Sequence, residues 1–270
     1  MRYRLDHDLH IHSGLSLCSR DPEQTPARIL QYAAENGFRH VCLTDHFWDE
    51  DVPHVDFDFY NVQNTAHIAR ALPLPQAPNV QFCFGCETEL DRDGRLGVLP
   101  QHMDDYAFII IPTTHMHMPP FTIREEDDSL ARRTALFVER YQQVLDMDLP
   151  FHKVGLAHLT CSLMGGMGPE NFHKHLQMLH SLSEEVLRHL FEQTADKGMG
   201  VELNFAIERY SGAEREIVLR PYRLAKDCGC RFYFGSDAHH PAELDKARAR
   251  FEAIVDALDL QETDKFRPFD

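Results

Sequence analysis

The sequence lacks several features that would place the chain in a familiar class of protein. Its seven cysteines include a single C-x-x-C pair, Cys83 and Cys86, and no apolar run approaches the length of a membrane span. Basic residues are scarce, because 27 Lys and Arg stand against 43 Asp and Glu for a formal net charge of −16. A phosphate backbone or an anionic membrane requires a positive protein surface. We therefore expect neither a long nucleic acid nor a membrane among the partners of this chain.

The first residues also lack the apolar segment of a signal peptide, since 1–7 read MRYRLDH. The number of cysteines is odd, and Cys42, Cys83 and Cys86 lie in apolar runs, where we expect small buried thiols. No disulfide framework is therefore implied, which favours a reducing compartment. We expect a soluble cytoplasmic protein. The 270 residues suit one large α/β domain or two small ones. Because no boundary or repeat is visible, we expect a single domain over 1–270.

Short apolar runs recur along the chain and predict strands that are buried on both faces of a parallel sheet. Helical patterns lie between them, which predicts an α/β fold with helical crossovers. Seven such strands favour a closed (β/α)7 barrel, similar to a TIM barrel, over an open sheet. The strands are expected at about 4–11, 40–44, 80–87, 107–113, 154–157, 200–204 and 231–236. The helices are expected at about 25–37, 129–147 and 183–197, with two more that start near Pro221 and Pro241.

These strand patterns end in imidazole and carboxylate side chains. His10 and His12 are two residues apart, and alternate residues of a strand share one face. An isolated H-x-H pair is a weak signal, because two half-buried histidines explain it equally well. The pattern continues, however, at or just beyond later strand ends, with His46, Glu87, His115, His158, Asp237 and His239. Such groups are ligands for Zn, Mn or Fe, and burying so many of them without an ion would be costly.

In combination and in order, these residues resemble the motifs of the PHP (polymerase and histidinol phosphatase) superfamily. The resemblance rests on Asp8-Leu9-His10-Ile11-His12, Thr44-Asp45-His46, Glu87, His115, His158 and Gly235-Ser236-Asp237-Ala238-His239, and it runs from residue 8 to about 240. It implies a distorted seven-stranded β/α barrel with a trinuclear metal site at the carboxyl ends of its strands.

Carried over by motif, the resemblance implies three divalent ions, which would be Zn, Mn or Fe. The first ion would be held by His10, His12, Glu87 and Asp237. The second would share Glu87 and add His115 and His158. The third would take His46, His239 and the residue eight positions after the first histidine, which is Cys18 here and histidine or aspartate in many members. A thiolate ligand would favour zinc or iron, and the alternative is a free thiol beside a weaker or empty third site.

Three neighbouring ions suit hydrolysis of a phosphate monoester, because they lower the pKa of a bridging water and neutralise the phosphoryl oxygens. The expected partner is therefore a small phosphorylated metabolite, and histidinol phosphate is the candidate that the family name supplies. Glu87 and Asp237 would bridge or hold ions at the reacting centre. Further candidates are Arg209 for the phosphate and His117 as an acid for the leaving group, although a surface or loop position explains either equally well. Candidates for orienting ligands or water are Asp45, Glu202 and Asn204.

Three other functions remain open from the sequence. The first is a phosphodiesterase or exonuclease acting on nucleotides, and the second is a metal-binding module without catalysis. The third is an amidohydrolase, which also begins with His-x-His but usually requires a metal-bridging lysine, and Lys153 precedes its strand here. The long connections 47–79 and 117–129 follow strand ends, so we expect them to be loops at the same edge.

Overall fold

The computed structural model describes all 270 residues and has an α/β fold built on parallel strands. One sheet has the order β1-β2-β4, from β1 (His7–Ile11), β2 (His40–Leu43) and β4 (Gln81–Phe84). The other has the order β3-β5-β6-β7-β8-β9, from β3 (His46–Phe47), β5 (Cys86–Thr88), β6 (Ile109–Ile111), β7 (Val154–Leu156), β8 (Gly200–Leu203) and β9 (Arg231–Phe234). Each strand expected from the sequence coincides with one of these, and 80–87 is divided into β4 and β5. Strand β3 was not expected.

The two sheets approach each other at β1 and β9. Ile11 forms a parallel bridge with Ala238, and the backbone N–H of Asp237 donates to the carbonyl oxygen of His10 at 2.7 Å. On the other side, β4 leads into β5 through Gly85. A Cβ at Gly85 would lie 2.4 Å from the carbonyl oxygen of Phe108, so only glycine allows the chains to pack this closely. The strands form two sheets, and closure into one barrel stays a prediction.

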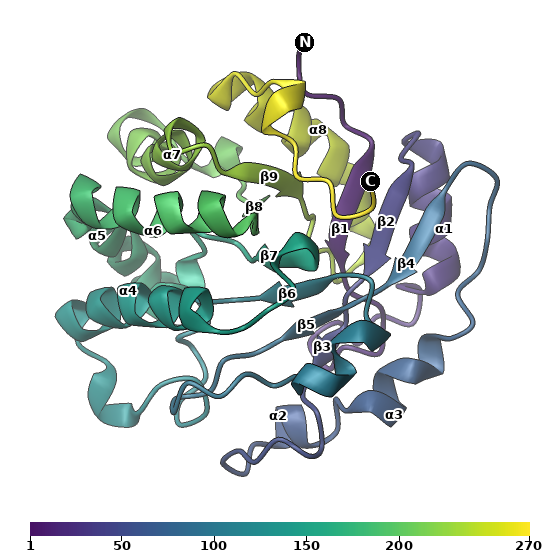
Figure 1. The fold of residues 1–270 in the computed structure, drawn as a ribbon, viewed down its shortest axis with the longest axis horizontal. Helices are drawn as coiled ribbons and strands as arrows, with labels where there is room; N and C mark the ends of the chain where they lie inside the picture. Colours follow the sequence, from purple (N-terminus) through teal and green to yellow (C-terminus); the bar gives the residue numbers. More distant parts are fainter.

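Helices surround the strands (Figure 1), with α1 beside the first sheet and α4 to α7 on the opposite side. The helices are α1 (Pro26–Glu35), α2 (Asp58–Asn61), α3 (Thr65–Ile68), α4 (Leu130–Asp146), α5 (Phe172–Ser181), α6 (Glu184–Lys197), α7 (Gly212–Asp227) and α8 (Pro241–Leu258). The predicted starts of three helices are confirmed, because Thr25, Ser129 and Ser183 are the N-caps of α1, α4 and α6 and accept hydrogen bonds from their first turns. Helix α5 was not predicted.

The prediction of a helix start near Pro221 is wrong, because α7 begins at Gly212 and Pro221 lies inside it. Proline usually marks the first turn, since it lacks the N–H that an interior position needs. Here the buried face of the helix continues on both sides of the proline, through Val218, Leu219 and Tyr222. Tertiary packing of this face outweighs the missing backbone hydrogen bond.

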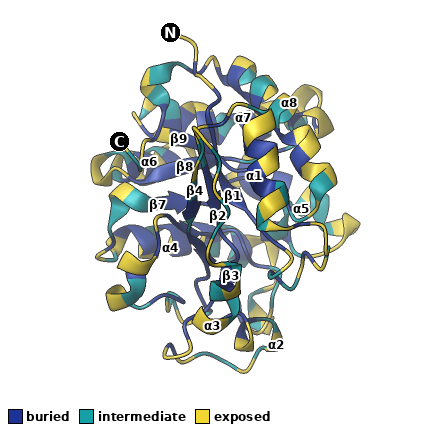
Figure 2. Ribbon diagram, turned by 90° about the vertical axis from the view of Figure 1, so that its right-hand side faces the viewer, coloured by how far each residue is buried: buried dark blue, intermediate teal, exposed yellow.

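The core lies between the strands and the helices, and a cluster of 58 buried residues fills it. Figure 2 shows the central strands as buried and the outer faces of the helices as exposed. A smaller cluster, which includes Leu9, Cys42, Phe108 and Tyr233, packs separately from the main core. Cys42, Cys83 and Cys86 are buried, as the sequence predicted. No helix is long and apolar enough to cross a membrane.

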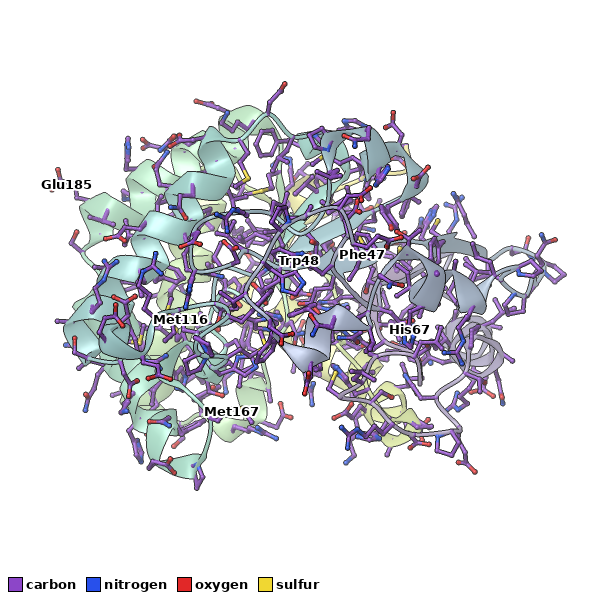
Figure 3. The ribbon with its side chains drawn as sticks, turned by 90° about the horizontal axis from the view of Figure 1, so that it is seen from below. Phe47, Trp48, His67, Met116, Met167 and Glu185 are labelled. Carbon is purple, nitrogen blue, oxygen red and sulfur yellow. The ribbon has the colours of Figure 1, made fainter.

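The connection 47–79 is more ordered than the loop that we expected. It holds part of β3 together with α2 and α3, which lie at the end of the molecule toward which β2 runs (Figure 1). Trp48, Tyr60 and Phe121 form a buried aromatic cluster, with Tyr60 stacked on Phe121 at 4.8 Å between ring centroids. Figure 3 views this end and places Phe47 and Trp48 near the middle of the molecule. This packing fixes the chain directly after His46.

Candidate metal centre

The carboxyl ends of the strands bring the predicted ligands together. Three groups of side chains have ligand atoms within 4.8 Å of one another, which is close enough to hold a metal ion. They are His10, His12, Glu87 and Asp237; Glu87, His115 and His158; and His12, His46 and His239. Glu87 belongs to two groups and His12 to two, so the three positions are adjacent.

The first group has the geometry and the chemistry of an ion site. The Nε2 atoms of His10 and His12 are 3.0 Å apart, and they lie 3.4 and 3.3 Å from Oε2 of Glu87. Asp237 Oδ1 is 3.5 and 3.1 Å from the same two nitrogens. Tetrahedral ligands at about 2.0–2.2 Å from an ion are roughly 3.3–3.6 Å apart. Four atoms that offer lone pairs at these separations repel one another unless a cation lies between them.

Glu202 orients His10 within this group. Its carboxylate accepts a hydrogen bond from Nδ1 of His10 at 2.7 Å and another from the backbone N–H of His158 at 2.5 Å. Since Nδ1 carries the proton, Nε2 presents its lone pair to the site. A Cβ at Gly235 would lie 2.0 Å from Oε1 of Glu202 and 2.4 Å from Cβ of His10. Glycine at 235 is therefore what lets the two side chains meet.

His12 is oriented through Ser16, which the sequence did not single out. The Ser16 hydroxyl donates to Oδ1 of Asp45 at 2.6 Å, so its oxygen accepts from Nδ1 of His12 at 2.9 Å. Asp45 also accepts from the hydroxyl and the backbone N–H of Ser13. Asp45 thus supports an imidazole, as the sequence suggested, but it does so through a serine.

Glu89 and Arg140, also missed from the sequence, support the second group. Nδ1 of His115 donates to Oε2 of Glu89 at 2.8 Å, and Nη2 of Arg140 lies 3.3 Å from Oε1 of the same carboxylate. Nε2 of His158 is 3.2 Å from Oε1 of Glu87. The spacing Glu87-x-Glu89 was the available signal, because alternate residues of a strand share a face.

The third group differs from the expected one, because His12 accompanies His46 and His239, and Cys18 is in none of the three groups. Nδ1 of His239 donates to the carbonyl oxygen of Asp237 at 2.8 Å. The other ring nitrogen, Nε2, therefore keeps its lone pair for an ion. Cys18 as a whole residue is exposed. Its sulfur, however, points inward, and desolvation of the sulfur, followed by the charges of Asp237 and Glu87, raises the pKa of the thiol. Ligation by Cys18 stays a prediction.

Comparisons with known proteins agree with this geometry. The family model of the PHP domain matches residues 8–206 of the chain. This chain belongs to the PHP domain family. No curated protein is found that matches it.

Two solved structures share the fold of this PHP domain. One is histidinol phosphate phosphatase from Lactococcus lactis subsp. lactis Il1403, solved with zinc, L-histidinol and phosphate, with 16% identity and a TM-score of 0.55 over 92% of this chain and 93% of that chain. The other is a candidate histidinol phosphatase from Listeria monocytogenes, with 13% identity and a TM-score of 0.62 over 91% of this chain and 99% of that chain. Asp237 and His239 lie beyond the matched residues, so the structure alone brings them to the other ligands.

Charges within the PHP domain are strongly coupled. Burial alone would raise the pKa of Glu87, but His46 and His10 hold it well below its usual value. Burial acts to lower the pKa of His12, but Asp237 and Glu87 raise it to about 9. Burial and the neighbouring His12 lower the pKa of His239 to about 3. The carboxylates of Glu87 and Asp237 therefore stay ionised, which is the form that ligates a cation.

A cavity of about 220 Å³ opens beside His158 and Asp237, and Arg209 and Asn204 lie in its wall. The side chain of Arg209 is exposed. His117 is half-buried, with its ring centroid 5.0 Å from that of His115, and burial followed by His46 lowers its pKa to about 4. Arg209 therefore lies near His158 and Asp237, and His117 lies near His115.

Lys153 lies away from the three groups. Its Nζ donates to the carbonyl oxygens of Met103 and Tyr106 at 2.9 and 3.2 Å, before the start of β7. An amidohydrolase would need this amine at the carboxyl end of its strand. The structure therefore argues against the amidohydrolase alternative.

Proposed function

We propose that this PHP domain is a metal-dependent phosphatase that hydrolyses a small phosphate monoester. The observation that carries the proposal is the sharing of Glu87 and His12 among three adjacent ligand groups. Adjacent ions concentrate positive charge, and a phosphate dianion is the substrate group that matches it. The cavity with Arg209 beside the same groups supplies a place for the ester.

The proposed cofactors are three divalent ions, of zinc, manganese or iron. Bound ions would act as Lewis acids and lower the pKa of a bound water, which makes water a nucleophile at neutral pH. The chain itself presents the ligands in a fixed orientation. Glu202 fixes the ring of His10, Ser16 fixes that of His12, and Glu89 fixes that of His115. Because these partners are buried, the rings lose little freedom when ions bind.

The remaining candidates act on the ester. Arg209 would pair with the phosphoryl oxygens, since a guanidinium binds phosphate with two parallel hydrogen bonds. His117 lies beside His115, where it would contact the leaving group. A cavity of about 220 Å³ suits a small metabolite better than a polynucleotide. Histidinol phosphate is the first substrate to test, because the Lactococcus lactis structure holds L-histidinol and phosphate.

We also propose that the two sheets form one interrupted seven-stranded barrel. The contact between β1 and β9 and the passage of β4 into β5 support this arrangement. In such a barrel β2 and β3 count as one strand, as do β4 and β5. All the ligand groups then lie at one rim, where barrel enzymes carry their sites.

The test is a panel of phosphate monoesters and diesters, including histidinol phosphate, assayed with added Mn²⁺ or Zn²⁺. We expect turnover of monoesters by the wild-type protein and none by Asp237→Ala, whose circular dichroism should match that of the wild type. Diester cleavage alone would favour the phosphodiesterase alternative. Stoichiometric metal without turnover of any ester would favour a non-catalytic module.

A further inference from the structure

Donor groups without acceptors converge on the cavity beside His158 and Asp237. Nδ2 of Asn204 and Nε of Arg250 are buried and have no hydrogen-bond partner. Arg250 forms an ion pair with the exposed Glu208, but Oε1 of Glu208 lies 3.7 Å from Nε, too far for a hydrogen bond, and an exposed pair of this kind contributes little. A buried donor without an acceptor is unfavourable, so such a site favours a ligand that brings acceptors.

The missing hydrogen bond of Arg250 Nε is not explained by a shortage of acceptors. The chain has 43 Asp and Glu, and Arg248 on the same helix contacts both a backbone oxygen of Asn36 and the carboxylate of Glu252. Arg250 instead extends from α8 to the wall of the cavity, on the side of η7 (Ile207–Arg209). Nε of Arg250 can therefore donate a hydrogen bond to a ligand in the cavity beside Asp237.

The two carboxylates in the walls of the cavity already have partners. Asp237 belongs to the first ligand group. Glu243 also lines the cavity, but its Oε2 accepts from the backbone N–H groups of His239 and His240 at 2.7 and 3.2 Å. Phe172 and Tyr210 are stacked, with ring centroids 5.7 Å apart, and close another side. The cavity therefore offers donors and an aromatic wall beyond the place proposed for the scissile phosphate.

We propose that Arg250 and Asn204 bind a second anionic group of the substrate. The inference rests on the proposed phosphatase function and names its substrate class: a phosphate monoester that carries a second anion, a carboxylate or another phosphate, a few bonds from the ester. Arg209 and the ions would take the ester, and Arg250 would take the second anion. A substrate with a cationic amine in this position would face two guanidinium groups, so it would bind less well.

The test measures binding by calorimetry with Mn²⁺ present. The ligands are 3-phosphonopropionate and phosphonoacetate, each compared with the alkylphosphonate of the same length that lacks the carboxylate. We expect the wild type to bind at least one carboxylate-bearing ligand about 10- to 100-fold more tightly than its partner, the range for hydrogen bonds to a charged group. In Arg250→Gln this ratio should fall to about 1. Arg231→Gln removes the same charge at the amino end of β9, away from the cavity, and should keep the wild-type ratio.

Equal affinities in the wild type, or a ratio that survives in Arg250→Gln, would overturn the inference. Thermal melting shows whether Arg250→Gln is folded, and Arg250→Lys, which keeps the charge, should give an intermediate ratio. Hydrolysis of a phosphate monoester that carries no second charged group is measured separately on the wild type. Turnover without a preference for the second anion removes this inference alone, whereas a preference without turnover of any ester removes the proposed function.

Discussion

Replacing Glu202 with glutamine tests whether the orientation of His10 controls metal binding. The carboxylate accepts two buried hydrogen bonds, from Nδ1 of His10 and from the backbone N–H of His158. An amide offers only one oxygen, so one of the two donors would face an NH₂ group. A buried donor left unpaired costs about 1–3 kcal/mol. If His10 loses its partner, we expect metal affinity to fall by about 10- to 100-fold, the usual effect of losing such a partner.

The assay is competition for Zn²⁺ between the protein and a chromophoric chelator. Glu185→Gln is the matched control, because Glu185 is exposed on α6 at the outer edge of the molecule (Figure 3). The control should bind metal as the wild type does. If Glu202→Gln also binds every ion within about twofold of the wild type, the support of His10 by Glu202 does not matter for metal affinity, and our reasoning about the first group is wrong.

Two further predictions concern a thiol and a buried ion pair. Cys18→Ser should lower the metal content by one ion per chain, as measured by elemental analysis, while Cys228→Ser should not; unchanged content and rate would show that Cys18 is not a ligand. Lys265→Met should lower the free energy of unfolding in urea at pH 7 by about 1.5–3 kcal/mol, because Asp6 loses a charge-assisted hydrogen bond of 2.9 Å from the amine and keeps only His7 and the exposed Arg4. Burial alone would raise the pKa of Asp6, but His7 and Lys265 hold it well below its usual value, so this stabilisation is present above about pH 4 and is lost as the pH falls further. The difference between wild type and variant should therefore narrow at pH 3, and an equal or wider difference there would contradict the assignment.

The sequence was sufficient to predict which side chains at strand ends come together. His10, Glu87, His115 and His158 each end or follow an apolar run, and parallel strands carry their carboxyl ends to the same edge. Consecutive strands joined by helical crossovers usually lie side by side in a parallel sheet. The sequence alone therefore predicts that the side chains at their carboxyl ends lie close together.

The supporting residues were not foreseeable in the same way. Ser16 and Arg140 are ordinary side chains in the sequence, and only the packing of distant segments shows that they reach Asp45 and Glu89. The start of α7 was misplaced for a related reason, since the packing of its buried face overrides the local preference of Pro221. The absence of Cys18 from the third group likewise depends on the path of one loop.

Two of the ligand groups join β1 to β9, since His10 lies in β1, His12 directly follows it, and Asp237 and His239 follow β9. During synthesis on the ribosome, His10 and His12 emerge long before Asp237 and His239. These two groups can therefore form only after β9 has been made and has docked beside β1. Ions bound there would stabilise the docked arrangement over any chain that stops before Asp237, because such a chain lacks their ligands.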